Sequence, residues 1–268
     1  MASATARLPG LGTVLGAQVR YQLTLLIRTP RALILALALP GIMLTVEVTQ
    51  TKHQVAKSLL TAEVSGLIVF GTLSIAYVTY AAGLVAAREE GILRRWRLTP
   101  LPAWGYFAGR IVAAVVLADA SGALLLVAGV ALAHLHLTAG MALSLLLADT
   151  VGALALAAAG TAITPLITSV AGANPVLVFT YVPLLIFSGG FGSMTLPHWL
   201  TTAMSYFPVQ PVIHAVSHAL QPGGGLISAR DLAVLAAWAA GCTVLSVRYF
   251  RWDPYRPAHA VQAPHGRT

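Results

Sequence analysis

The chain has 268 residues, of which 57% are hydrophobic and 9% are charged, and its formal net charge is +8. Soluble domains have roughly 25% charged residues, and a soluble protein of this length could not place so much apolar surface inside. The composition therefore excludes a soluble enzyme or binding domain and predicts an all-α, polytopic membrane protein. The single cysteine, Cys242, excludes an intramolecular disulfide framework and a zinc site built on several cysteines.

Residues 8–28 form the first predicted element, a helix that lies in the membrane interface rather than crossing it. Their apolar residues recur three to four positions apart, while Arg20, Gln22 and Arg28 fall elsewhere, and this pattern is typical of an interfacial helix. Later apolar segments come close to the roughly 20 residues that a helix needs to cross a bilayer. We predict six spans, over residues 32–48, 64–87, 106–133, 141–164, 175–187 and 232–249.

The segment between the fifth and sixth spans, residues 188–220, is moderately apolar but interrupted. A Ser-Gly-Gly-Phe-Gly-Ser run begins it, and Pro197, Pro208 and Pro211 break it further. Irregular backbone at membrane depth persists only where it is buried in protein or lines a wet cavity. We therefore predict an outer re-entrant or membrane-surface hairpin here, followed after the last span by a basic tail over residues 251–268. Residues 1–268 are expected to form a single transmembrane domain.

Lysine and arginine are distributed unevenly between the two sides of this topology. One side has three of these residues: Lys52, Lys57 and Arg230. The other side has thirteen: Arg7, Arg20, Arg28, Arg31, Arg88, Arg94, Arg95, Arg97, Arg110, Arg248, Arg251, Arg256 and Arg267. Because basic residues favour the cytoplasmic side, we expect both termini and the loop after the second span to face the cytoplasm. The net charge then reflects membrane topology, and no nucleic-acid partner is expected.

The densest cluster of charge is Arg88–Pro102, between the second and third spans, where six of the first ten residues are ionised. Three apolar residues, Ile92, Leu93 and Trp96, share one helical face by their spacing. Glu90 and Arg94 stand four residues apart in the favourable order, and Thr99-Pro100 ends the helix. This pattern predicts an amphipathic helix over residues 88–98. It serves either as a positive-inside anchor or as a docking helix for a cytoplasmic partner.

Two acidic residues fall inside predicted spans. Asp119 lies near the centre of the third span, where a carboxylate costs roughly 2.5–3.5 kcal/mol on insertion scales, and Asp149 lies in the outer half of the fourth. Either they line a polar substrate path, or each bonds a hydroxyl or backbone group inside the bundle. We interpret His134 and His136 as two interfacial histidines at a span end, because no acidic partner is near enough in sequence for a metal site.

No Gly-x-x-x-x-Gly-Lys-Ser/Thr loop is present, so any energy from ATP must come from another polypeptide. The remaining features resemble the type-2 permease of ATP-binding-cassette exporters, in its daunorubicin-resistance-like group. That group has an Arg-Glu-x-Gly-x-Leu…Thr-Pro pattern in its first cytoplasmic loop, matched here by Arg88, Glu89, Gly91, Leu93, Thr99 and Pro100. The outer segment also follows the family in Phe187-Ser188-Gly189, Met194-x-x-Pro197-x-Trp199-Leu200 and Pro208-Val209. It departs at Phe207, His214 and Ser217, where the family often has Asn, an acidic residue and an arginine.

The resemblance implies that residues 88–98 are a coupling helix that sits on a cytoplasmic ATPase subunit. The candidate coupling residues are then Arg88, Glu89, Glu90, Gly91, Leu93, Arg94, Trp96, Thr99 and Pro100, and Asp119 and Asp149 are the candidate path residues. Trp96 is the expected anchor on the ATPase, and Gly91 is expected to permit close approach of its backbone.

The resemblance further implies a permease of the bacterial plasma membrane, in contact with lipid, that needs no cofactor or metal and is not itself an enzyme. It would pair with a second permease chain, identical or different, and export an amphipathic drug, antibiotic or lipid-like molecule by alternating access. Two alternatives stay open. One is a proton-coupled secondary transporter that uses Asp119, and the other is an intramembrane enzyme, for which the sequence offers no credible catalytic pair.

Overall fold

The computed structural model describes residues 11–28, 38, 40–43, 45–46, 57–98, 103–133, 137–187, 197–221, 223–250 and 252–253. Most of the predicted first span lies outside the described residues, as do the start of the outer hairpin, Thr99, Pro100, His134, His136 and nearly all of the tail. Within the described residues every regular element is a helix, as the composition predicts.

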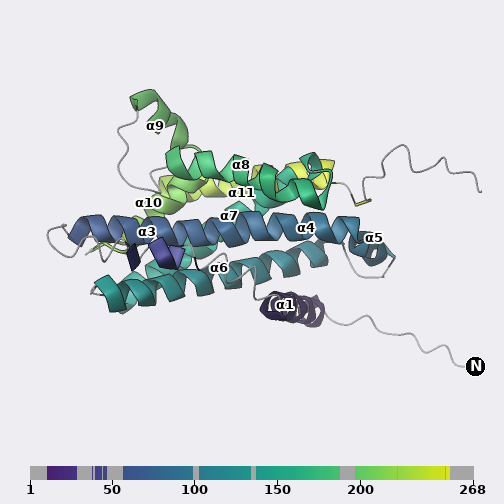
Figure 1. The fold of residues 1–268 in the computed structure, drawn as a ribbon, viewed down its shortest axis with the longest axis horizontal. Coiled ribbons are helices and arrows are strands. Elements are labelled where there is room, and N and C mark those ends of the chain that lie inside the picture. Colours follow the sequence, from purple (N-terminus) through teal and green to yellow (C-terminus); the bar gives the residue numbers. More distant parts are fainter. Residues whose placement is uncertain are drawn as a thin grey trace, which may run out of the picture.

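Four helices of the described part are long and apolar enough to cross a membrane: Thr61–Glu89, Trp104–Ala131, Ala139–Leu166 and Ala229–Tyr249. The first of these joins α3 (Lys57–Leu73), a π-helical segment η1 (Ser74–Thr79) and α4 (Tyr80–Glu89) into one rod. The others are α6 (Ala103–Ala133), α7 (Ala139–Ile163) with the 3₁₀ turn η2 (Thr164–Leu166), and α11 (Ala229–Tyr249). Figure 1 shows them side by side along the long axis, together with the shorter apolar helix α8 (Val170–Phe187).

Small residues let α7 and the α3–α4 rod approach closely. A side-chain carbon at Gly160 of α7 would lie 3.2 Å from the backbone oxygen of Tyr77, and Ala153, Ala155 and Ala157 of the same helix are fully buried. Helices inside a membrane gain from such close backbone packing because lipid gives no hydrophobic drive for their association. The rod and α7 consequently form the centre of the bundle.

The N-terminal helix α1 (Leu11–Arg28) crosses the direction of the bundle, and Figure 1 shows it nearly end-on beside α6. Gln18 and Gln22 are buried. A side-chain carbon at Gly109 of α6 would lie 2.8 Å from the Cβ of Gln18, so this glycine makes room for α1. The arrangement is that expected of a helix lying in the plane of the membrane interface.

The described part of the outer hairpin contains α9 (His198–Met204) and α10 (Val209–Ala219). The second of these packs into the bundle against α7 and α3, and it buries Val209, Val212 and Val216 completely. Pro208 directly precedes α10 and Pro211 falls in its first turn, where the missing proline N–H has no helical partner to lose. Two of the prolines that interrupt this segment thus lie at a helix start.

Two helix boundaries differ from the sequence prediction. The fifth apolar helix, α8, begins at Val170 and contains Pro175 as an internal residue, whereas the prediction began the span at Pro175 after a polar turn. The earlier start is stabilised because the first N–H groups of α8 have side-chain acceptors: the backbone N–H of Gly172 donates to Ser169 Oγ at 3.1 Å. The second span extends from Lys57 to Glu89 rather than over residues 64–87.

Candidate functional site

The charged segment after the second span is a turn followed by a short helix. The α4 helix ends at Glu89, Gly91 has a φ of +70°, and α5 spans Ile92–Arg97. The left-handed conformation of Gly91 is one that glycine adopts without the steric cost that a side chain brings. The predicted continuous helix over residues 88–98 is therefore broken at Gly91, and the predicted Glu90–Arg94 helical pair is not formed.

Arg88 is buried and Glu89 is exposed, and both bind backbone groups of their own chain, while their predicted role in coupling to an ATPase stays a prediction. Arg88 is 1% exposed, and its guanidinium donates to the backbone carbonyls of Thr164, at 3.1 Å, and Ile167. Glu89 Oε1 accepts the backbone N–H of Val170 at 3.1 Å. The carbonyls at the end of one helix and the N–H groups at the start of the next lack helical partners, and these two side chains supply them.

We call the contacts of Arg88 and Glu89 the loop clamp. It ties the end of α4 to the α7–α8 loop, residues 164–170, which lies at the same end of the bundle as α5. The loop clamp therefore connects the end of α4 to both α7 and α8.

The apolar face of α5 also packs inward. Leu93 is completely buried, and Ile92 and Trp96 pack with it against a cluster that contains Tyr106 of α6. The ring of Trp96 lies 5.4 Å from that of Tyr106. Trp96 thus anchors α5 on its own chain and is only partly buried, and its predicted contact with an ATPase stays a prediction.

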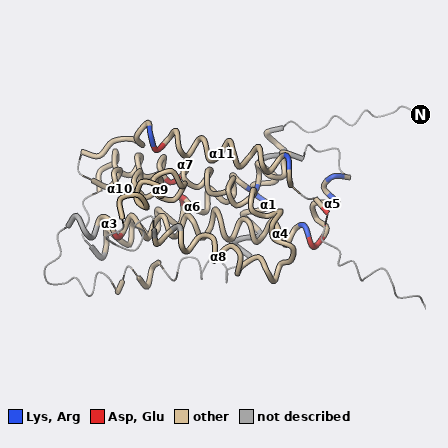
Figure 2. The backbone as a smooth tube through the Cα atoms, turned by 90° about the horizontal axis from the view of Figure 1, so that it is seen from above, with Lys and Arg blue, Asp and Glu red and all other residues tan. Residues whose placement is uncertain are grey.

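The exposed residues of this segment in the described structure are Glu89, Glu90, Arg94, Arg95, Arg97 and Leu98, the last exposed by 83%. Figure 2 shows basic residues gathered at this end of the bundle. Beside them, Arg97 stacks over Trp252, 5.6 Å from its ring, and Trp252 contacts Phe107 of α6. The residues after α11 therefore join the charged segment at this end.

The structure brings Asp119 of α6 and Asp149 of α7 together. Asp119 bonds Thr150, the residue that follows Asp149 on α7, and we call the two acidic residues the carboxyl pair. Asp149 is 2% exposed and its Oδ1 accepts from Thr72 Oγ1 at 2.5 Å, while Asp119 Oδ2 accepts from Thr150 Oγ1 at 2.9 Å. Gly122 makes the approach possible, because a side-chain carbon there would lie 3.1 Å from Asp149 Oδ2.

The remaining oxygens of the pair, Asp119 Oδ1 and Asp149 Oδ2, are buried and have no hydrogen-bond partner among the described residues. A pair of carboxyl groups with oxygens to spare can accept hydrogen bonds from a substrate or attract a cationic group. The described residues contain no group of three or more His, Cys, Asp and Glu that could hold a metal ion.

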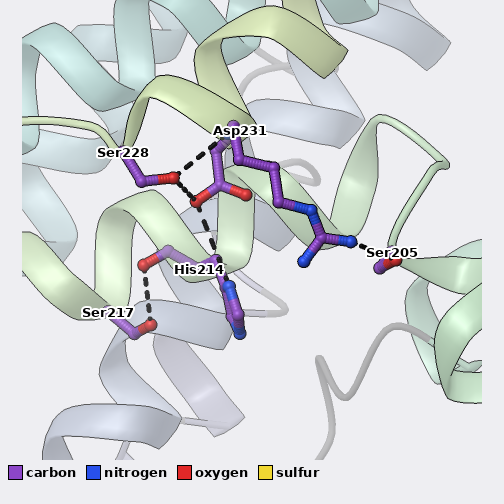
Figure 3. A network of polar contacts seen from close by, with 6 residues as sticks. Ser205, His214, Ser217, Ser228 and Asp231 are labelled. Atoms are coloured by element: carbon purple, nitrogen blue, oxygen red, sulfur yellow. Dashed lines mark hydrogen bonds and ion pairs between the residues drawn. The ribbon is translucent and has the colours of Figure 1, made fainter.

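A separate polar network lies at the opposite end, where α11 begins (Figure 3). Ser228 Oγ donates to Asp231 Oδ2 at 2.8 Å, and the same carboxylate lies 4.0 Å from His214 Nδ1 of α10. Arg230 donates to Ser205 Oγ at 2.8 Å. These contacts join α11 to the outer hairpin. They also show what His214 touches at a position where the resembled family usually has an acidic residue.

Several contacts of the site gave no signal in the sequence. Arg88 binds backbone carbonyls, and backbone groups are present at every position, so no side-chain pattern indicates them. Thr72 and Thr150 support the carboxyl pair, but threonine is an ordinary residue in apolar helices. Gly122, a small residue three positions after Asp119, is the one signal in the sequence that could have indicated the pair.

Comparison with protein families decides the class. The family model for ABC-2 family transporter proteins matches residues 33–248, which is most of the chain and includes both the charged segment and the carboxyl pair. The chain belongs to the ABC-2 transporter family. A search of curated proteins found no match. This ABC-2 family protein is therefore a multi-pass membrane permease, the membrane component of a transport system, as the sequence predicts.

Proposed function

We propose that this ABC-2 family permease is the membrane subunit of an ATP-driven exporter, and that α5 and the loop clamp couple it to a separate ATPase. One observation supports this most directly. A short helix at one end of the bundle has its apolar face fixed to the chain, and its outer face, Arg94, Arg95 and Leu98, is left exposed. A helix that served only as a topological anchor would need the charges but not the clamp.

The rest of the assembly follows from this role. Two permease chains, identical or related, work with two ATPase chains, and the substrate passes between the permeases by alternating access. The basic residues at the α5 end of Figure 2 support a cytoplasmic position for that end and for both termini, in a bacterial plasma membrane. The substrate is an amphipathic drug, antibiotic or lipid-like molecule of the kind handled by the daunorubicin-resistance-like group, and the carboxyl pair meets its polar part.

The coupling proposal is tested at Leu98, which is apolar and 83% exposed at the α5 end. The chain is purified with a candidate ATP-binding-cassette ATPase, and the co-purified amount is measured for wild type, Leu98→Asp and the matched control Leu137→Asp. Leu137 is also exposed but precedes α7, at the opposite end of the bundle. We expect Leu98→Asp to weaken the complex about tenfold, which corresponds to about 1.4 kcal/mol, and Leu137→Asp to leave it unchanged. Equal effects of the two variants would refute α5 docking.

A proton-coupled transporter is the second candidate, favoured by the carboxyl pair because two interacting carboxyl groups inside a membrane are suited to accept and release protons. The two candidates differ in what drives transport. In proteoliposomes, an exporter needs ATP and its ATPase, whereas the alternative moves substrate along a proton gradient with this chain alone and stops doing so in Asp119→Asn. Uptake or export by the chain alone would therefore overturn the ATP-driven proposal.

A further inference from the structure

Arg110 is a cation inside the apolar helix α6, about seven residues from its start and so roughly 10 Å along the helix axis. Its position within the helix is fixed by aromatic residues. The guanidinium donates to the hydroxyl of Tyr106 at 3.0 Å and lies 5.7 Å from that ring and 5.8 Å from the ring of Tyr80 on α4. Tyr80 is in turn held by a hydrogen bond of 3.0 Å between its hydroxyl and that of Thr161.

The α4 helix leaves room for the charged group. A side-chain carbon at Gly83 would lie 2.6 Å from an Arg110 terminal nitrogen, a distance that real side chains do not adopt. Gly83, Tyr80 and Tyr106 therefore form a seat that holds the guanidinium in one place. Arg110 itself is half-buried, and none of its nitrogens is among the buried polar atoms without a partner. Its free N–H groups thus reach the molecular surface.

Nothing in the described part of the chain neutralises this charge. The ion pairs of the described residues include none at Arg110, and Asp119 stands nine residues further along α6, roughly 13 Å away along the axis. A charged side chain inside a membrane segment is expensive unless it is paired. A fixed, accessible and unneutralised guanidinium calls for an anion from outside the chain.

The depth of Arg110 indicates which anion. The neighbouring residue, Gly109, contacts Gln18 of α1, the helix that lies across the bundle as an interfacial helix does. Arg110 is therefore near the level of lipid headgroups on the side where the chain's basic residues gather. The cytoplasmic leaflet is rich in anionic lipid, and a guanidinium binds phosphate oxygens through two parallel N–H groups.

We propose that Arg110, seated on Tyr80 and Tyr106 beside Gly83, binds the phosphate group of an anionic phospholipid from the cytoplasmic leaflet. The site holds one lipid headgroup between α4, α6 and α1. It is separate from the carboxyl pair and from α5, so it does not rest on the proposed ATP-driven export.

The test measures lipid retained by the detergent-purified full chain in native mass spectrometry, with phosphatidylglycerol or phosphatidylcholine added. Wild type is compared with Arg110→Gln and with Arg230→Gln. The control is matched, because Arg230 also stacks on a tyrosine, 5.7 Å from Tyr206, and also donates to a hydroxyl, but lies at the outer end. We expect Arg110→Gln to reduce phosphatidylglycerol affinity about fivefold and Arg230→Gln to leave it unchanged. Equal retention in wild type and Arg110→Gln overturns the site.

Gly83→Ala tests whether lipid binding depends on the position of the Arg110 guanidinium or only on the net charge of the chain. The new methyl group displaces the flexible end of Arg110 while the charge and the fold are kept, so it should also lower phosphatidylglycerol retention. If Gly83→Ala binds like wild type, a located site is overturned. Phosphatidylcholine, which has a phosphate but no net charge, should bind less than phosphatidylglycerol in wild type. Finally, inorganic phosphate is added as a competitor: release of the lipid at millimolar phosphate would show that the site takes a soluble anion and overturn the lipid proposal.

Discussion

Replacing Arg88 is the sharpest test of the loop clamp, because a buried guanidinium there binds two backbone carbonyls 76 and 79 residues away in sequence. Hydrogen bonds to charged groups contribute about 1.5–3 kcal/mol each. Arg88→Met keeps the length of the side chain but loses both bonds. Part of this loss is offset because a charge no longer has to be buried. We therefore expect a net destabilisation of about 3 kcal/mol, concentrated in the α7–α8 loop.

Two further substitutions serve as comparisons for the loss of stability in Arg88→Met. Arg88→Lys keeps the charge, but an ammonium group does not reproduce the planar fork that reaches both carbonyls, so we expect about half of the effect. Arg95→Met removes a charge from an exposed side chain of the same segment, and surface changes of this kind are usually within 0.5 kcal/mol. The order Arg88→Met, Arg88→Lys, Arg95→Met is therefore expected for the loss of stability.

Hydrogen exchange of the loop amides is the measurement. The N–H of Ile167 donates to the carbonyl of Thr164 at 3.1 Å, and the N–H of Val170 donates to Glu89. A loss of about 3 kcal/mol raises the opening equilibrium about a hundredfold, so peptides that contain these amides should exchange about a hundredfold faster in Arg88→Met. If they exchange as in wild type while global unfolding is unchanged, the clamp does not hold this loop and the coupling argument fails.

Two glycine substitutions test other parts of the structure by thermal unfolding in detergent. Gly91→Ala should destabilise the protein by about 1–2 kcal/mol, and Gly91→Asn should destabilise it by less. The cost comes from the left-handed backbone conformation, because no atom lies within 4 Å of the new carbon. Equal effects of the two variants would indicate a steric cause instead. Gly152→Ala should destabilise by about 1–3 kcal/mol, since the new carbon would lie 2.7 Å from Val212 Cγ1. Val212→Ala should restore part of this loss in the double variant, and purely additive effects would show that α10 does not pack there.

The length of the apolar segments, and the Gly and Pro residues between them, predicted the presence of the helices better than the residues at which they begin and end. Four described helices have the length and composition of membrane spans because a run of apolar residues can satisfy its backbone in lipid only as a helix. The break at Gly91 was available in principle, since a glycine after a helix commonly adopts the left-handed conformation. A side-chain carbon added at Gly91 would have no atom of this chain within 4 Å, so the turn itself depends on the left-handed conformation of the glycine, and the close approach of a partner there stays a prediction.

The charged segment shows that residues of a motif can have contacts within the chain that the motif does not indicate. The Arg-Glu pair of the pattern, predicted to couple to an ATPase, also completes helix ends of its own chain. Trp96, predicted as an anchor on the ATPase, packs on Tyr106 of its own chain. Large aromatic and buried charged residues stabilise intramolecular and intermolecular contacts by the same physics. The type of a residue therefore indicates that it forms a strong contact, but not whether that contact is within its own chain or with a partner.

The carboxyl pair shows a different limit of prediction from sequence, namely the contact between two helices. Sequence placed Asp119 and Asp149 at membrane depth, but their contact depends on how two helices are rotated about their axes. Neither helix has an amphipathic pattern that would fix this rotation, because each is apolar on all sides. The constraint is instead the small residue at Gly122, which admits the carboxyl group of Asp149.

The α3–α4 rod connects the three features that the function needs. Thr72 on the rod bonds the carboxyl pair, the π-helical segment Ser74–Thr79 follows directly, and Arg88 at the end of the rod holds the loop clamp. A π-helical turn is a rare element that commonly lies at functional sites, and here the hydroxyl of Tyr77 within it bonds Thr180 of α8 at 2.9 Å. The middle of the rod and its α5 end thus contact α7 and α8 through different residues. Under the proposed coupling, a push on α5 moves the rod and these helices together unless the π-helical turn absorbs the motion. We therefore expect this turn to set how much of a movement at α5 reaches the carboxyl pair.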